Sequence, residues 1–340
     1  MASFNRHIIV ITPLLLLSQI VSGQLINFSQ MYNAHLIMNP AQTGRFYGDM
    51  RSSWMYRSYG YDLSKPYSTF YMSIEDPVYI KKESFNIGGY FSHDNSAGSS
   101  ITANQFTLAT SKEIRLSLNH ALIVGLSAGY VLKQINTNGL TFPDQYSRET
   151  GTFDPSLPTS DIFEESKNSY LDLGFGLLSS NKLTNGSLSI GFAMFHLNRP
   201  NETFFGINNQ IPLKWTVHAK SDLNLSKSIF ILPMFVYVEM AKANESIIGA
   251  NIGHVFGNEG LLPDNIIGGL HMRYSDLFRP LSYILTIGTK VKEWQIMVNY
   301  DIEAGNHRNN QMFNTAIELN LNYTLPSTKH QFRVLSCERY

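Results

Sequence analysis

Apolar and polar side chains alternate along residues 313–325. Odd positions are apolar (Phe313, Ile317, Leu319, Leu321, Tyr323 and Leu325), while the other face carries Asn314, Glu318, Asn320 and Asn322. A period of two residues predicts a β-strand with one apolar and one polar face. The polar face suits the lumen of a barrel better than a dry protein core.

Segments of this kind recur along the chain and predict 14 strands, an even number as in single-chain outer-membrane barrels. They lie at residues 45–57, 66–75, 84–93, 99–111, 118–134, 169–178, 187–197, 212–222, 229–240, 246–256, 265–274, 280–290, 293–302 and 313–325. The segment 99–111 is ambiguous. So is 229–240, which is apolar on both faces and contains Pro233.

The lengths of the connections indicate a transmembrane barrel. Long gaps at 135–168, 198–211 and 303–312 all follow odd-numbered strands, whereas tight connections at 179–186, 223–228 and 291–292 follow even-numbered strands. Such barrels have short turns at one rim and long loops at the other, so we predict the long loops on one side of a membrane.

The two predicted faces differ in chemistry. Trp54, Trp215 and Trp294 fall on the apolar face, as expected for rings at a membrane interface. Charges of both signs fall on the inner face, which favours ion pairing over an ion-selective pore: Asp49, Arg51, Arg57, Glu75, Asp172, Lys214, Lys220, Arg273, Asp301 and Glu318. Glycines inside the strands indicate bends or close approach in a curved sheet: Gly88, Gly89, Gly125, Gly129, Gly174, Gly176, Gly268 and Gly269.

Composition agrees with one large all-β domain, because no linker divides the 340 residues. The chain has 43% hydrophobic, 12% aromatic and only 15% charged residues. Its formal net charge is zero, which gives no electrostatic case for nucleic acid as a partner. Cys337 is the single cysteine, so no intramolecular disulfide can form.

The amino terminus has the order of a secretory signal over residues 1–23. Arg6 precedes an apolar run at 8–17, and small residues end at Gly23. No later stretch reaches the roughly 18 consecutive apolar residues that a spanning helix needs. We therefore predict an exported chain with no helical anchor.

Catalytic and metal-binding patterns are weak. The histidines form no pair at zinc spacing, and there is no Gly-x-Ser-x-Gly motif. Four acidic residues of the longest connection, Asp144, Glu149, Asp154 and Asp161, are candidates for calcium but lack a regular spacing, so a solvated loop is the default. We expect no enzyme activity, cofactor or metal.

Residues 24–44 fit no strand pattern, but they contain Phe28-Ser29-Gln30 and Asn39-Pro40-Ala41 followed by Gly44. Here the chain resembles the PorP/SprF family, outer-membrane proteins of the type IX secretion and gliding machinery of Bacteroidetes. Further similar motifs are His196-Leu197-Asn198-Arg199-Pro200, Tyr300-Asp301 and the strand at 316–323. The ending Cys337-Glu338-Arg339-Tyr340 is similar to a family tail that commonly reads Cys-Pro-Arg-Phe, with Glu338 and Tyr340 as departures.

The resemblance implies a closed antiparallel transmembrane β-barrel of about 14 strands in the outer membrane of a Gram-negative bacterium. It would contact outer-membrane lipid, type IX secretion components, a large secreted adhesin, and a periplasmic lipoprotein or peptidoglycan-linked protein. The expected layout is a signal peptide (1–23), a periplasmic or plug segment (24–44), the barrel (45–325) and a periplasmic tail (326–340). Candidate contact or plug residues are Phe28, Gln30, Tyr32, Asn39, Pro40, His196, Pro200, Arg339 and Tyr340.

Three alternatives remain open at this point. A transport barrel for small or apolar solutes would also be membrane-bound but would work by passage. An outer-membrane hydrolase would need Ser or Asp gathered with His at the rim. A secreted soluble β-sandwich would leave the membrane fraction in a high-salt wash.

Overall fold

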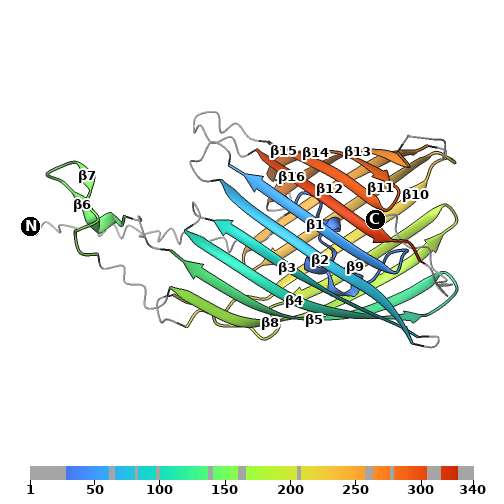
Figure 1. Ribbon diagram of the computed structural model, residues 1–340, viewed down its shortest axis with the longest axis horizontal. Helices are drawn as coiled ribbons and strands as arrows, with labels where there is room; N and C mark the ends of the chain where they lie inside the picture. Colours follow the sequence, from blue (N-terminus) through green and yellow to red (C-terminus); the bar gives the residue numbers. More distant parts are fainter. Residues whose placement is uncertain are drawn as a thin grey trace, which may run out of the picture.

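The computed structural model describes residues 28–60, 66–80, 83–96, 100–136, 141–159, 166–204, 208–256, 263–275, 279–304 and 315–327. Fourteen strands close into one barrel (Figure 1). They are β1 (Met50–Tyr59), β2 (Tyr67–Ile80), β3 (Glu83–Ser96), β4 (Ile101–Arg115), β5 (His120–Ile135), β8 (Lys167–Leu183), β9 (Gly186–Phe195), β10 (Lys214–Asn224), β11 (Ile229–Met240), β12 (Ala243–Val255), β13 (Asn265–Ser275), β14 (Arg279–Val291), β15 (Trp294–Glu303) and β16 (Ala316–Leu325).

Each of the 14 barrel strands pairs antiparallel with its neighbours in the chain, and β1 closes the barrel against β16. The short strands β6 (Tyr146–Ser147) and β7 (Thr152–Phe153) form a separate hairpin inside the longest connection. Closure pairs the backbone groups that an open sheet would leave at its edges, which is required where no water is available. The predicted fold and number of strands are confirmed. The predicted boundaries at 45 and 118 are wrong by a few residues, since β1 begins at Met50 and β5 at His120.

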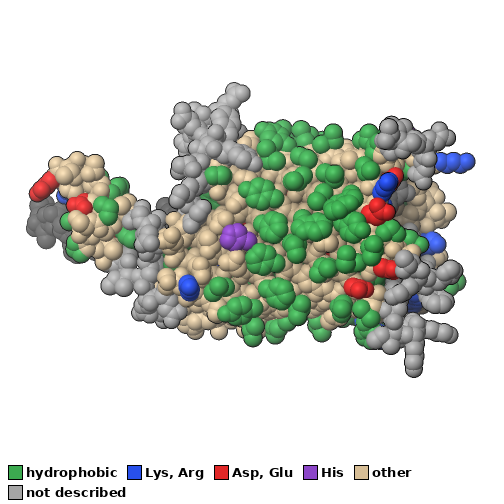
Figure 2. Space-filling model, viewed as in Figure 1, with side chains coloured by type: hydrophobic (Ala, Val, Ile, Leu, Met, Phe, Trp, Pro, Cys, Tyr) green, Lys and Arg blue, Asp and Glu red, His purple; other side chains and the backbone are tan. Residues whose placement is uncertain are grey.

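The barrel is apolar outside and polar inside. Figure 2 shows hydrophobic side chains spread over the outer wall, and many are half exposed, including Leu126, Leu285 and Ile287. The three tryptophans alternate with buried inward residues and therefore lie on the outer face; Trp54 stacks on Trp294 with ring centroids 6.1 Å apart. This pattern is that of a wall in contact with hydrocarbon.

The two ends of the barrel carry different connections. We call the end with the connections 60–66, 136–166, 196–213 and 304–315 the outer end, and the other end, where Met50 and Leu325 lie, the inner end. Loop lengths sort largely as predicted. Four connections are exceptions: 97–100, 241–242 and 276–278 are short at the outer end, and 256–264 is longer at the inner end. None of the helices among the described residues is long and apolar enough to cross a membrane.

The ambiguity of 229–240 has a structural explanation. On β11, Pro233 points outward, and the inward residues Phe230, Leu232, Met234, Val236 and Val238 are also apolar and buried. Met234, Val236 and Val238 belong to one buried cluster with Phe28, Tyr32 and Leu36. Both faces of β11 are therefore apolar because its inner face packs against another part of the chain.

The outward face gives a direct test of membrane contact. Leu285 lies at the centre of β14, and we expect Leu285→Arg to destabilise the folded barrel by about 2–4 kcal/mol, since an arginine would face hydrocarbon at mid-depth. The same change at Leu118, in the exposed inner-end turn between β4 and β5, should cost about 0–1 kcal/mol. The measurement is urea titration of folding into lipid vesicles. Equal costs at the two positions would argue against a lipid-facing wall.

A buried luminal segment as the candidate functional site

Residues 28–46 lie inside the barrel, and every one of them is buried. We call them the luminal segment. It contains three short helices, η1 (Met31–Asn33), α1 (His35–Met38) and η2 (Pro40–Gln42), visible in blue within the barrel in Figure 1. The segment contacts strands on many sides of the wall, so the polar inner face predicted from the sequence lines a lumen that is filled by the chain itself.

The first anchor of the segment lies near the outer end. The backbone N–H groups of Ser29 and Gln30 donate to the two carboxylate oxygens of Glu318, with N···O distances of 2.5 and 3.1 Å. The Ser29 hydroxyl donates to Asp301 Oδ1 at 2.6 Å. Arg57 binds Asp301 at 2.8 Å, lies 3.5 Å from Glu318 and donates to Ser29 Oγ. Charges on three strands thus hold the backbone of two segment residues.

Further polar groups support this anchor. The amides of Asn299 and Asn320 donate to Glu318 Oε1 at 3.1 and 3.0 Å. Arg273 pairs with Glu245, lies 3.4 Å from Asp301 and donates to the carbonyl of Phe28. Glu318 is completely buried, so its charge depends on these donors for compensation.

The middle of the segment packs through aromatic and apolar side chains. Phe28 makes an edge contact with Tyr71 on β2, with centroids 6.0 Å apart. The Tyr32 hydroxyl donates to the carbonyl of Ala219 at 2.6 Å, and the Lys220 ammonium lies 5.2 Å from the Tyr32 ring centroid. The Gln30 amide donates to Thr286 Oγ1 at 2.8 Å.

His35 lies in the buried helix α1. Burial lowers the pKa of His35 well below its usual range, and the positive charges of Arg51 and Lys220 act in the same direction. Both effects disfavour a charged imidazole at this position.

A glycine cradle receives the turn at Asn39-Pro40-Ala41. A Cβ atom at Gly125 on β5 would overlap the backbone of Pro40 and Ala41, and one at Gly176 on β8 would overlap the Asn39 side chain. These two glycines are paired across the strands. Asn39 caps η2 by accepting from the Ala41 N–H at 2.8 Å and donates to the carbonyls of Leu177 and Phe192 on the wall. The turn can approach the wall closely because neither glycine has a side chain.

The second anchor lies near the inner end. The Gly44 N–H donates to Glu75 Oε2 at 2.8 Å, and Arg51 pairs with Glu75 at 3.0 Å. Phe46 lies against Arg51, with the guanidinium carbon 4.7 Å from the ring centroid. Arg45 donates to Ser180 Oγ at 2.9 Å. Gly44 has a φ of +67°, a conformation that favours glycine. The segment is thus held at both ends by buried carboxylates.

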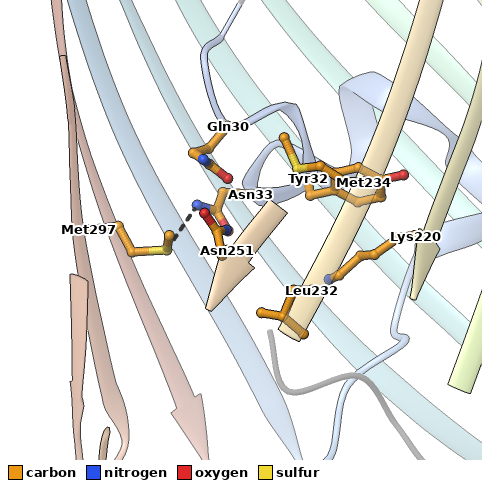
Figure 3. Close-up of a pocket in the computed structure, with 8 residues that line it drawn as sticks. All are labelled: Gln30, Tyr32, Asn33, Lys220, Leu232, Met234, Asn251 and Met297. Carbon is orange, nitrogen blue, oxygen red and sulfur yellow. Dashed lines mark hydrogen bonds between the residues drawn. The ribbon is translucent and has the colours of Figure 1, made fainter. Parts of the chain in front are cut away.

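A small hollow remains beside the segment (Figure 3). Its lining combines amides, sulfur and apolar groups: Gln30, Tyr32, Asn33, Lys220, Leu232, Met234, Asn251 and Met297. The Asn33 amide points across it to Met297 Sδ at 3.6 Å. Among the described residues, no group of three or more His, Cys, Asp or Glu side chains could hold a metal ion.

The structure separates the residues proposed from the sequence into two groups. Phe28, Gln30, Tyr32, Asn39 and Pro40 all belong to the luminal segment. His196 and Pro200 lie in the turn that follows β9 at the outer end, where the His196 N–H and Nδ1 both contact Asp172 Oδ1, at 3.0 and 2.9 Å. Arg339 and Tyr340, the signal peptide and Asp161 lie outside the described residues.

Sequence reasoning did not single out the wall residues that hold the segment. The sequence places Arg57, Glu75, Asp301 and Glu318 on the inner face, the last two within motifs similar to the family, but does not show what they bind. It indicates bends or close approach at Gly125 and Gly176, and the close approach is confirmed. The pairing of these wall residues with the segment depends on which strands face each other across the lumen. The sequence contained one signal for such contacts: charges of both signs concentrate on the inner face of a chain that has few charges.

A closed 14-stranded antiparallel barrel with an apolar outer wall defines a β-barrel membrane protein of the outer-membrane type. The model of the family described as "Type IX secretion system membrane protein PorP/SprF" matches residues 20–323. The chain belongs to the PorP/SprF family of type IX secretion system membrane proteins.

One solved structure supports the fold, and a second is reported beside it. The CymD monoaromatic hydrocarbon channel is similar with a TM-score of 0.54 and 10% identity, over 88% of this chain and 94% of that one. A Pseudomonas aeruginosa FadL homologue has a TM-score of 0.47 and 9% identity, over 84% and 91% of the two chains. No curated protein matches the sequence. At these identities the likeness to CymD concerns the fold alone.

Proposed function

We propose that this barrel is a docking component of the type IX secretion and gliding machinery. It would support the secretion or surface anchoring of a large adhesin and contact periplasmic ring lipoproteins or a peptidoglycan-linked protein. Membership in the PorP/SprF family supports the assignment to the machinery. The proposal describes a non-enzymatic wall that presents loops and chain ends to partners.

The observation that carries this proposal is the filled lumen. Residues 28–46 are buried throughout and are bound to the wall by carboxylates near both ends. A barrel whose interior is occupied by its own chain is better suited to holding partners than to passing solutes. The second candidate function is the passage of small or apolar solutes. It would require the contacts between these carboxylates and the luminal segment to break each time the lumen opens.

Within the proposal, the long outer connection contacts the exterior partner. The hairpin β6–β7 carries a T-shaped pair of half-exposed rings, Tyr146 and Phe153, with centroids 5.3 Å apart. Gln145 fixes the hairpin by donating to the carbonyls of Pro155 and Leu157. Exposed aromatic side chains on a locally ordered hairpin are suited to protein contact.

We expect the double change Tyr146→Ser and Phe153→Ser to reduce adhesin display on cells while the barrel stays folded, because the changed rings lie outside the barrel wall. Thr150→Ala, an exposed position in the same hairpin, is the matched control and should leave display unchanged. The measurement is antibody staining of the displayed adhesin. Unchanged display in the double variant would remove the hairpin from the proposal.

Association with the machinery needs a separate test. Gentle detergent extraction of the full chain, followed by mass spectrometry, should recover type IX components and a large secreted protein. Recovery of the barrel alone would contradict the docking role and favour the transport candidate.

A further inference from the structure

The direction of the luminal segment through the barrel is fixed by its two anchors. Ser29 is held by Arg57, Asp301 and Glu318, each of which lies two residues from the outer end of its strand. Arg273, which contacts Phe28, is also two residues from the outer end of its strand.

The other end of the segment lies at the opposite rim. Arg45 contacts Glu113, two residues from the inner end of β4, and Ser180, three residues from the inner end of β8. From there the chain continues to Met50 and starts β1 at the inner end. The chain therefore runs from the outer half of the lumen at Phe28 to the inner end at Arg45.

We propose that the amino-terminal end of the mature chain is presented at the outer mouth of the barrel, on the same side as the long loops, and not in the periplasm. To reach the inner end, the residues before Phe28 would have to run back through a lumen that the luminal segment already fills. Only four residues separate Phe28 from the expected cleavage site after Gly23, a reach of about 14 Å when extended. The amino-terminal residues are then an exterior-facing element, available to the same side as the hairpin β6–β7.

This proposal changes the expected role of residues 24–44. The sequence suggested that these residues either contact the periplasm or plug the lumen. The proposal drops the periplasmic contact: the segment begins at the outer mouth and then continues through the lumen. The carboxyl-terminal end behaves differently, because β16 ends at Leu325 on the inner side and Ser327 donates to Asp49 Oδ1 at 2.9 Å. The proposal therefore places the two ends of the mature chain on opposite sides of the barrel. The inference follows from the fold and does not depend on the proposed function.

Epitope accessibility tests the proposal in the full chain. A ten-residue epitope flanked by glycine and serine is inserted between Gln24 and Leu25, which leaves the expected cleavage site intact. Reference proteins carry the same epitope after Thr150, in the long outer connection, or after Tyr340. Antibody binding is compared between intact cells and cells with a permeabilised outer membrane, and folding is checked by the heat-dependent electrophoretic shift of the barrel.

The proposal predicts that the amino-terminal epitope binds antibody on intact cells, as the Thr150 epitope does, while the Tyr340 epitope binds only after permeabilisation. Binding of the amino-terminal epitope only after permeabilisation, together with the Tyr340 epitope, would overturn it.

A smaller probe covers the case in which the insertion prevents folding. Asn27→Cys in a Cys337→Ser background contains a single thiol, since Cys337 is the one native cysteine. A membrane-impermeant maleimide should label this thiol from the same side as a Thr150→Cys control. Labelling from the opposite side would contradict the proposal.

Discussion

Glu318→Gln should destabilise the folded barrel by about 3 kcal/mol, at the lower end of the cost of leaving a buried charge without its partner. Glu318 is fully buried, and its carboxylate accepts from the backbone of Ser29 and Gln30 while lying 3.5 Å from Arg57. The amide has one acceptor oxygen and no charge, so it cannot serve all these donors. The cost stays near the lower end because Asp301 still pairs with Arg57.

Urea titration of folding in lipid vesicles measures this loss. Glu149→Gln is the matched control, since Glu149 is exposed in the hairpin connection, and it should leave stability unchanged. Adding Arg57→Ala to Glu318→Gln should cost less than the sum of the single changes if the two side chains are coupled. Additive costs would show that the pairing does not stabilise the luminal segment.

Gly125→Val should displace the Asn39-Pro40-Ala41 turn from the wall and open the lumen. The added side chain would meet the backbone of Pro40 and Ala41, which cannot move aside as a flexible side chain could. Overpacking of this kind typically costs about 1–3 kcal/mol, which the luminal segment can escape by leaving its cradle while the strands stay paired. We therefore expect ion conductance across planar bilayers to rise in the variant.

Gly268→Val provides the control for this experiment. Gly268 lies on the outer face of β13, and a Cβ atom there would meet nothing within 4 Å. The same residue change at this position should leave conductance unchanged. Equal conductance of the two variants would mean that the cradle does not hold the segment in place.

The fold could be predicted from the sequence because a lipid-facing wall imposes a period of two residues on every strand. Segments such as 313–325 and 293–302 show this alternation plainly. The segment 229–240 does not, since residues of its inner face share a buried cluster with Phe28 and Tyr32, which lie far away in the sequence. Local pattern carries no information about such a distant contact.

The candidate site could be predicted only in part. Phe28, Gln30, Tyr32, Asn39 and Pro40 were selected through a family resemblance, and they do lie together in the lumen. Their wall partners could not be assigned, because alternation shows that Glu318 points inward but not that it meets a residue 289 positions away in the chain. The direction in which the luminal segment runs through the barrel could not be predicted either, because it depends on which anchor lies near which end of the barrel.

Conductance of the unaltered protein tests the central claim most directly. The claim is that the chain fills its own lumen and that the barrel serves as a closed wall for docking. In planar bilayers the full-length protein should show no stable open-channel current under conditions in which Gly125→Val conducts. A large, steady conductance from the unaltered barrel would contradict the account and would favour passage of solutes through the lumen.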